Sequence, residues 1–201
     1  MQRVVLGTKN KDKRNELRSL LRGTRIEVLS LADFPPCGDV KESGRTFEQN
    51  AGKKARAYSL HTGLLTLADD SGLVVPVLGG RPGVYSARFA GEGCAYADNN
   101  GKLLRLLKKV RAPGRSATFV CVMALYDKGR KVAVARGECS GRIARAPGGR
   151  HGFGYDPVFI PRGFKKTFAE ISPAAKNKIS HRGRALRAAK KAILNYLKKT
   201  S

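Results

Sequence analysis

The sequence predicts an α/β fold, in which helices flank a mixed sheet. Two observations carry this prediction. Short apolar segments of strand character alternate with segments whose leucines recur at helical spacing. Two long strand-like segments near the middle of the chain are separated only by Asp127-Lys128-Gly129, which predicts a hairpin. Because no internal repeat or low-complexity linker interrupts the 201 residues, we expect one domain over residues 1–201.

The first 45 residues predict two strands around a helix. Residues 3–7 are typical of a short buried strand, and residues 26–29 of a second one. Between them, leucines at helical spacing predict a helix over residues 11–22, with Asn10 near its N-terminal cap. Prolines and glycines in residues 33–45 predict a loop.

The next segment predicts a capped helix and an interrupted strand. Thr46-x-x-Gln49 is a capping box that begins a helix, and Gly63 is placed to end it. Residues 65–68 are expected to form a strand that stops at Asp69-Asp70-Ser71-Gly72. Strand structure then resumes at residues 73–75.

The second half predicts a loop, a helix, the long hairpin and a C-terminal helix. Residues 79–93 are rich in Gly, Pro and small side chains and predict an ordered loop, and residues 98–109 predict a helix. The hairpin strands are expected over residues 117–126 and 131–145. The C-terminal helix shows one apolar stripe, formed by Leu186, Ala189, Ile193 and Leu197.

Composition excludes several classes of protein. Hydrophobic residues make up 41% and charged residues 27%, which is enough apolar material for a core and excludes a wholly disordered chain. The longest apolar run is too short to span a membrane, and the N-terminus lacks a signal-peptide pattern, so we expect a cytoplasmic protein without a membrane partner. The four cysteines show neither Cys-x-x-Cys pairing nor histidines at ligand spacing, which predicts reduced thiols and no structural zinc.

The net charge of +25 is concentrated in the second half of the chain. Residues 1–100 hold 15 basic and 11 acidic side chains, whereas residues 101–201 hold 25 basic and 4 acidic ones. This imbalance favours a polyanion, whether nucleic acid, an anionic membrane surface or nucleotide phosphates. A solvated lysine-rich face explains the same count, so charge alone does not choose among these alternatives.

A polar segment between the first strand and the first helix is a candidate phosphate site. Exposed N–H groups at a helix start bind anions, and lysines neutralise phosphate charge. The segment lacks the Walker pattern, and its lysines fit ordinary surface positions as well. Its residues are Thr8, Lys9, Asn10, Lys11, Asp12 and Lys13.

Asp69-Asp70-Ser71-Gly72 is a candidate catalytic segment. Adjacent side chains in extended backbone point to opposite sides, and we expect both carboxylates at the carboxyl end of a strand, where open α/β sheets bind ligands. Paired carboxylates suit Mg²⁺, and one of them suits a base that activates water. The alternative is a turn in which aspartate caps backbone N–H groups.

Two later motifs are candidates for recognition. Gly152-Phe153-Gly154-Tyr155-Asp156-Pro157 lets a flat ring lie close to the backbone, which fits a base pocket or an aromatic packing loop. Lys176-x-x-x-Ser180-His181-Arg182-Gly183 gathers cationic side chains near a helix start, which suits a phosphate or a keto oxygen. For His181 taken alone, a structural histidine is the better interpretation.

Taken in this order, the motifs resemble the inosine triphosphate pyrophosphatase family, whose members hydrolyse non-standard purine nucleotides such as dITP, ITP and XTP. The resemblance also includes Thr46-Phe47-x-x-Asn50-Ala51 and the block from Leu78 to Arg88, and it covers nearly the whole chain. It implies a homodimer of subunits with two lobes and a central cleft. It also implies cleavage between the α- and β-phosphates, giving a nucleoside monophosphate and pyrophosphate.

The resemblance also implies roles for particular residues. Asp70 is expected to activate the water and to bind Mg²⁺, with Glu42 as a second metal ligand and Asp69 assisting. Thr8 to Lys13 are expected to bind the triphosphate, and Ser71 to contact substrate. The recognition set for base and phosphate is Phe153, Gly154, Tyr155, Asp156, Lys176, His181 and Arg182.

Physical chemistry agrees with purine discrimination at the 6-position. A pocket of donors such as His181, Arg182 and backbone N–H groups suits a keto oxygen and leaves the amino group of adenine unpaired. Each such mismatch costs about 1–3 kcal/mol, so two reject ATP by roughly 10²- to 10⁴-fold. Lys9 stands where many relatives have Gly, and the chemistry does not require the +25 charge. The rival interpretation is therefore a basic nucleic-acid-binding protein that keeps this fold without the activity.

Overall fold

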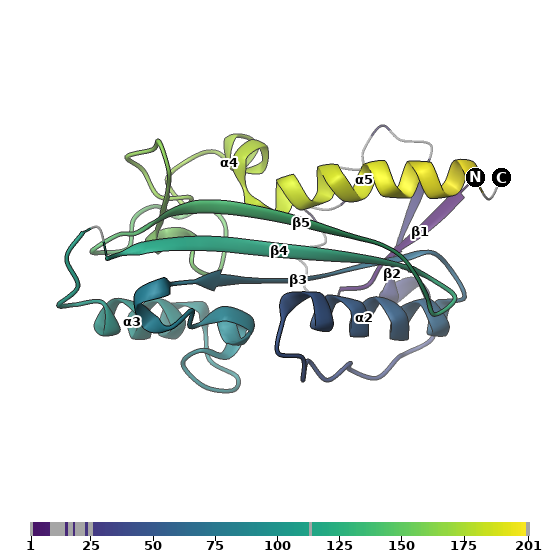
Figure 1. Cartoon of the computed structure of the whole chain (residues 1–201), viewed down its shortest axis with the longest axis horizontal. Helices are drawn as coiled ribbons and strands as arrows, with labels where there is room; N and C mark the ends of the chain where they lie inside the picture. The colour runs from purple at the N-terminus through teal and green to yellow at the C-terminus, as the bar shows by residue number, and fades with distance from the viewer. Residues whose placement is uncertain are drawn as a thin grey trace. The chain divides into compact units, whose positions relative to one another are not determined.

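The computed structural model describes residues 2–8, 15, 18, 23, 26–112 and 114–199 (Figure 1). The strands are β1 (Gln2–Leu6), β2 (Ile26–Ser30), β3 (Thr66–Val74), β4 (Ser116–Asp127), β5 (Arg130–Ile143) and β6 (Phe159–Pro161). The α-helices that lie in the described residues are α2 (Phe47–Thr62), α3 (Tyr96–Leu106), α4 (Pro173–Ile179) and α5 (His181–Lys199). The predicted helix over residues 11–22 lies outside the described residues except for two isolated positions.

One mixed sheet joins the described strands in the order β2-β1-β3-β4-β5-β6. β1 pairs in parallel with both β2 and β3, whereas β5 and β6 are antiparallel. β4 and β5 form the predicted hairpin, and the turn residues Lys128 and Gly129 have φ values of 46° and 81°. Such left-handed values match the twist of a two-residue hairpin turn. The predicted mixed sheet with flanking helices is therefore confirmed.

Contacts divide the chain into two compact units. Unit 1 comprises residues 1–70, 121–137 and 182–201, and unit 2 comprises residues 71–120 and 138–181. The strands β3, β4 and β5 each contribute residues to both units. The single domain and the cleft between two lobes stay predictions.

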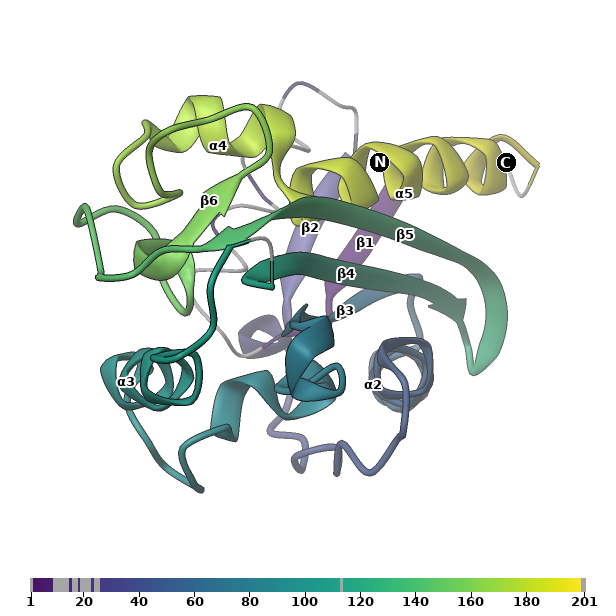
Figure 2. The same ribbon diagram turned by 60° about the vertical axis from the view of Figure 1, so that its left-hand side comes forward.

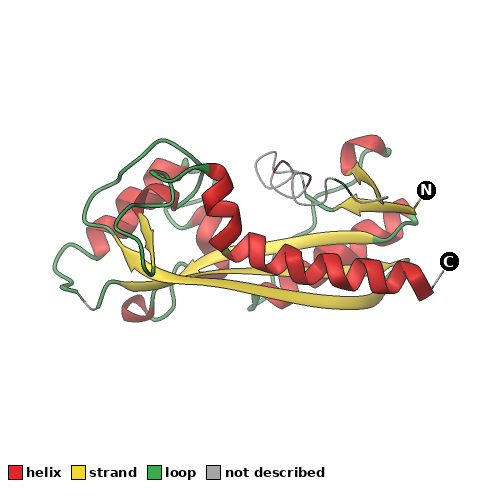
Figure 3. Ribbon diagram, turned by 90° about the horizontal axis from the view of Figure 1, so that it is seen from above, coloured by secondary structure: helices red, strands yellow, loops and turns green. Residues whose placement is uncertain are grey.

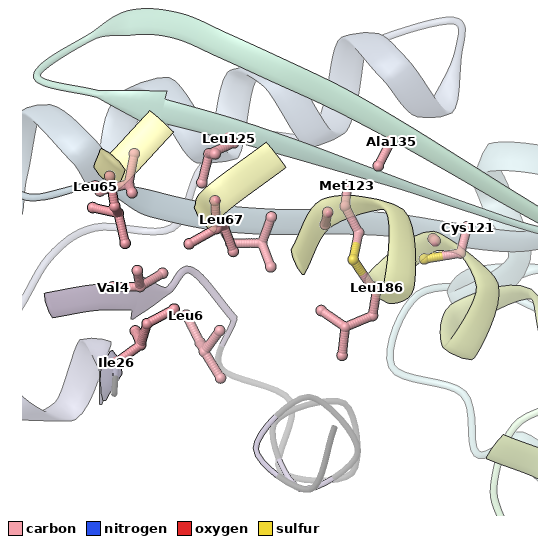
Figure 4. Close-up of a cluster of buried hydrophobic side chains, with 14 residues drawn as sticks. Val4, Leu6, Ile26, Leu65, Leu67, Cys121, Met123, Leu125, Ala135 and Leu186 are labelled. Atoms are coloured by element: carbon pink, nitrogen blue, oxygen red, sulfur yellow. The ribbon is translucent and has the colours of Figure 1, made fainter. Parts of the chain in front are cut away.

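Unit 1 is a sheet segment with α5 on one face and α2 on the other (Figure 1). Alternate residues of a strand point to opposite faces, so Val4 and Leu6 join the core beneath α5 while Val5 packs with Tyr58 of α2. Figure 4 shows Leu186 of α5 among the side chains of this core. The predicted apolar stripe of the C-terminal helix is buried as expected. In Figure 3, α5 lies along the long strands, and Gln2 Nε2 donates to Leu197 O at 3.1 Å.

Unit 2 has its own aromatic core. Phe119 of β4 lies edge-on to Phe159 at a centroid distance of 4.6 Å and stacks on Phe168 at 5.9 Å. α3 lies on one side of the strands of this unit and contributes the fully buried Leu103, whereas α4 lies on the other side (Figure 2).

Several predicted boundaries agree with the structure, and others are corrected. Thr46 caps α2 by accepting from Gln49 N, and Gly63 ends the helix at a left-handed φ of 67°. The expected break at residues 69–72 is wrong, because β3 continues through them without interruption. Residues 79–93 are not wholly loop, since residues 83–88 form a 3-10 helix. The short elements α4 and β6 were not expected.

None of the four cysteines forms a disulfide; Cys121 and Cys139 are buried, and Cys37 and Cys94 are half-buried. Within the described ranges, no helix combines the length and the apolar character that a bilayer crossing requires.

Candidate functional site

Asp69 and Asp70 lie inside β3 rather than at its carboxyl end, which corrects the expected position. Both side chains are buried, with 2% and 5% exposure. Because successive side chains of a strand point to opposite faces, the two carboxylates have different partners, as the sequence predicted. Asp69 Oδ2 lies 3.9 Å from Arg182 Nε, and Asp70 faces α2.

Two side chains of α2 hold Asp70. Asn50 Nδ2 donates to Asp70 Oδ2 at 3.1 Å, and Lys54 Nζ lies 3.8 Å from Asp70 Oδ1. Asn50 and Lys54 are four residues apart, so the helical repeat places both on one face. Burial of these polar groups is tolerated because they contact one another.

Lys54 also contacts the loop that precedes α2. Its Nζ donates to Glu42 Oε1 at 2.7 Å, and the Glu42 side chain is 32% exposed. Burial alone lowers the pKa of this ammonium group, but the nearby carboxylates of Asp69, Asp70 and Glu42 outweigh burial, and the net pKa is raised. Lys54 is therefore charged at neutral pH. Lys54 is not predicted from the sequence, although it lies one helical turn after Asn50 of the Thr46-Phe47-x-x-Asn50-Ala51 motif.

Glu42 and Asp70 are the two carboxylates that the sequence predicts as Mg²⁺ ligands. Lys54 Nζ lies between the carboxylates of Glu42 and Asp70 and contacts both. In the part of the chain that the structure describes, no cluster of three or more His, Cys, Asp or Glu side chains could hold a metal ion. Mg²⁺ is usually bound by one or two carboxylates, with water and substrate phosphates supplying its other ligands. The two carboxylates fit that pattern, and Mg²⁺ binding by Glu42 and Asp70 stays a prediction.

The proposed phosphate segment is described only at its first residue. Thr8 is half-buried and its N–H donates to Leu6 O at 2.9 Å. The preceding residue, Gly7, lies close to α2, because a Cβ at this position would be 2.9 Å from Tyr58 Cδ2. The positions predicted to bind phosphate after it, Lys9, Asn10, Lys11, Asp12 and Lys13, lie outside the described residues.

In unit 2, the glycine-rich aromatic motif is built around a buried ion pair. Lys176 Nζ donates to Asp156 Oδ2 at 2.8 Å, and the same carboxylate oxygen accepts from Phe153 N at 2.8 Å. Lys176 Nζ also lies over the ring of Phe153, 5.1 Å from its centroid. The structure thus brings together three residues that the sequence placed in the recognition set.

The neighbours of Phe153 in this motif are held by other parts of unit 2. Asn100 Nδ2 of α3 donates to Gly154 O at 3.0 Å. Tyr155 is buried, its hydroxyl donates to Ser86 O at 2.9 Å, and burial raises the pKa of this phenol. Tyr155 therefore packs inside unit 2, while Phe153 and Gly154 are half-buried, and a base pocket at this motif stays a prediction.

The remaining residues predicted to contact substrate are His181, Arg182 and Ser71. In unit 2, the His181 ring stacks on Phe119 with a centroid distance of 4.5 Å and an interplanar angle of 6°, and Ser71 is half-buried. In unit 1, Arg182 is buried and faces Asp69. The packed ring of His181 agrees with a structural role for that residue.

Comparisons with known proteins cover nearly all of the chain. Residues 4–192 match the Ham1 family. A protein named dITP/XTP pyrophosphatase from Desulforamulus reducens is 49% identical over 195 residues, which are 97% of this chain and 96% of that protein. One of the same name from Geobacillus kaustophilus is 50% identical over 186 residues, covering 92% and 91%.

Solved structures of similar proteins also match nearly the whole chain. A HAM1 protein from Coxiella burnetii is 39% identical with a TM-score of 0.89, and the match covers 97% of this chain and 100% of that one. A nucleoside-triphosphatase described as a dITP/XTP pyrophosphatase from Mycobacterium abscessus is 43% identical with a TM-score of 0.78, covering 94% and 98%.

Proposed function

The chain belongs to the Ham1 family, and from that premise we propose that it is a Mg²⁺-dependent nucleoside-triphosphate pyrophosphatase. Its substrates are non-standard purine nucleotides such as dITP, ITP and XTP, which it converts to the monophosphate and pyrophosphate. The relatives named dITP/XTP pyrophosphatase are 49% and 50% identical to this chain, and the matches cover 96% and 91% of their own lengths. The observation that carries the proposal is the buried Asp70 carboxylate, held between Asn50 and Lys54.

Asp70 takes the proton of the attacking water in this proposal. A general base must be fixed within hydrogen-bond reach of the proton it removes. Asn50 fixes one oxygen of Asp70, and Lys54 lies near the other. Lys54 is charged, so it also reduces repulsion between the carboxylates and an incoming anionic phosphate.

Charge neutralisation and positioning dominate phosphoryl chemistry. Glu42 and Asp70 would hold Mg²⁺, which when bound supplies positive charge to the triphosphate oxygens. The lysines of residues 9–13 and Thr8 bind the phosphates in this proposal, as the family resemblance implies. Asp69 holds Arg182, which is thereby oriented for recognition.

The residues of unit 2 recognise the purine in this proposal. The Lys176 ammonium is fixed by Asp156 and lies over the ring of Phe153, so the positions of these side chains are preorganised. Hydrogen-bond donors favour the 6-keto group of hypoxanthine and xanthine over the 6-amino group of adenine. We also propose that the enzyme is cytoplasmic and forms a homodimer. Light scattering, which gives the molar mass in solution, tests the homodimer.

Pyrophosphate release from ITP, dITP and XTP, with Mg²⁺ and with a chelator, tests the activity. We expect release only with the metal, and little release from ATP. Asp70→Asn should abolish turnover while the circular dichroism spectrum stays unchanged, and Lys13→Ala should raise KM or lower kcat. Turnover by Asp70→Asn close to that of the unsubstituted enzyme would remove Asp70 from its role. No release from any of these nucleotides would favour the rival, a basic nucleic-acid-binding protein.

A further inference from the structure

The loop that carries Glu42 is fastened to the first two turns of α2 by four consecutive contacts. Each loop residue from 42 to 45 meets one side chain of the helix, and the contacts run in opposite directions along the two segments. They are Glu42 Oε1 with Lys54 Nζ at 2.7 Å, Ser43 Oγ with Lys53 Nζ at 2.8 Å, Gly44 N with Asn50 Oδ1 at 2.7 Å, and Arg45 N with Gln49 Oε1 at 2.7 Å.

Asn50 differs from its helix neighbours because it contacts the loop through one end of its amide and Asp70 through the other. Its Oδ1 accepts from Gly44 N, and its Nδ2 donates to Asp70 Oδ2. The side chain is 0% exposed, and both ends of its amide have a protein partner. Since the amide is planar and rigid, the two contacts fix the loop backbone and the carboxylate relative to each other.

Gly44 shows how closely the loop approaches Asn50. A Cβ at position 44 would lie 2.6 Å from Asn50 Oδ1 and 2.8 Å from Gln49 Cβ, which is closer than real Cβ atoms come. Only glycine permits this approach of backbone to amide. The absence of a side chain at Gly44 therefore lets its backbone N–H reach the amide oxygen of Asn50.

We propose that Asn50 is a positioning residue for catalysis, which sets the position of Asp70 relative to the loop that carries Glu42. This inference rests on the proposed function of Asp70. The amide supplies both an acceptor for Gly44 N and a donor for Asp70, and glutamine, which has the same amide, is one methylene longer. Aspartate keeps the acceptor and loses the donor, and leucine loses both.

The test compares Asn50→Leu with Gln49→Leu, a matched control one residue earlier on the same helix. Gln49 also accepts from the loop backbone, but no contact of it with Asp70 occurs among the described interactions. For ITP hydrolysis, we expect Asn50→Leu to lose at least tenfold in kcat with KM within twofold of the unsubstituted enzyme. We expect Gln49→Leu to keep kcat within twofold.

Hydrogen exchange at the Gly44 amide gives a second measurement that does not depend on activity. Exchange should accelerate in Asn50→Leu and stay unchanged in Asn50→Asp, which keeps the acceptor. If Asn50→Leu fails to fold, Asn50→Asp should still lose at least tenfold in kcat, since a second carboxylate there either repels Asp70 or shares a proton with it, and a shared proton prevents Asp70 from accepting one from water.

Three results would overturn the proposal. These are a kcat within twofold in either Asn50 variant, an equal loss in Gln49→Leu, and unchanged Gly44 exchange in a folded Asn50→Leu. An unsubstituted protein that does not hydrolyse ITP would instead refute the proposed function. The exchange result would then still decide whether Asn50 holds the loop.

Discussion

Lys176 Nζ lies 2.8 Å from Asp156 Oδ2, and the two side chains are only 6% and 3% exposed. Charges withdrawn from water this far are stable only when each has its partner. The same aspartate accepts from Phe153 N, so a single carboxylate fixes both the lysine and the backbone that carries the aromatic ring. Stability and proposed base recognition therefore depend on one ion pair.

Asp156→Asn should lower the free energy of unfolding by about 3–5 kcal/mol, because it leaves the buried Lys176 charge uncompensated. Urea denaturation measures the change. The double variant Asp156→Asn with Lys176→Met removes both charges and should be more stable than the single variant. A single variant within about 1 kcal/mol of the unsubstituted protein would show that the pair is not buried as described.

Lys54→Met should lower kcat for ITP by roughly 10²-fold, the size typical for loss of one preorganised electrostatic contact. The cause is the loss of the charge that links Glu42 with Asp70. Lys53→Met is the matched control, since Lys53 contacts Ser43 at the surface, and its kcat should stay within twofold. Equal losses in both variants would contradict a specific role for Lys54.

β3 shows where sequence-based prediction succeeds and where it fails. The alternation of side chains along a strand predicted that Asp69 and Asp70 face opposite ways, and they do. The expected strand break was wrong because Asp-Ser-Gly favours a turn only when no tertiary partners compete. In the described residues, β1 pairs with β3 only at Thr66 and Leu67, so beyond these residues β4 is the neighbouring strand of β3. Pairing within the sheet there overrides the local turn preference.

The partners of the two aspartates explain what the sequence did not reveal. Asn50 is 20 positions away from Asp70 in the chain, and Arg182 is farther still from Asp69. No local pattern indicates which lysine of α2 lies beside a carboxylate, so Lys54 was missed. The family resemblance predicts a recognition role for Tyr155, and no local pattern indicates that its side chain is buried with its hydroxyl donating to Ser86 O.

A pH prediction follows from Tyr196 of α5. Its hydroxyl donates to Asp127 Oδ2 at 2.7 Å, and this hydrogen bond, with burial, raises the pKa of Tyr196 above its ordinary value of 10.0. The folded state holds the phenol proton more tightly than the unfolded state does. The stabilisation is therefore complete below pH 10 and is lost as the pH rises through the raised pKa.

Tyr196→Phe should cost about 1 kcal/mol at pH 8, the usual net contribution of a hydrogen bond. The difference between the two proteins should shrink at pH 11. Urea denaturation at both values measures it. A difference that grows at the higher pH would contradict the assigned direction.

A final prediction concerns the basic surface of α5. This helix has no acidic residue, and Lys191, Lys198 and Lys199 are exposed on it. We expect weak duplex DNA binding whose affinity falls steeply with salt, measured by fluorescence anisotropy.

Each phosphate contact contributes about 0.9 to the slope of log K against log salt, so changing the three lysines to glutamine should reduce that slope by up to about 2.7. Glutamines at the exposed Lys108, Lys109 and Arg111 remove the same charge from elsewhere, and should change the slope less because these residues follow the end of α3 rather than lying along a helix. Equal reductions would attribute binding to net charge alone, and a flat salt dependence in the unsubstituted protein would exclude phosphate contacts altogether.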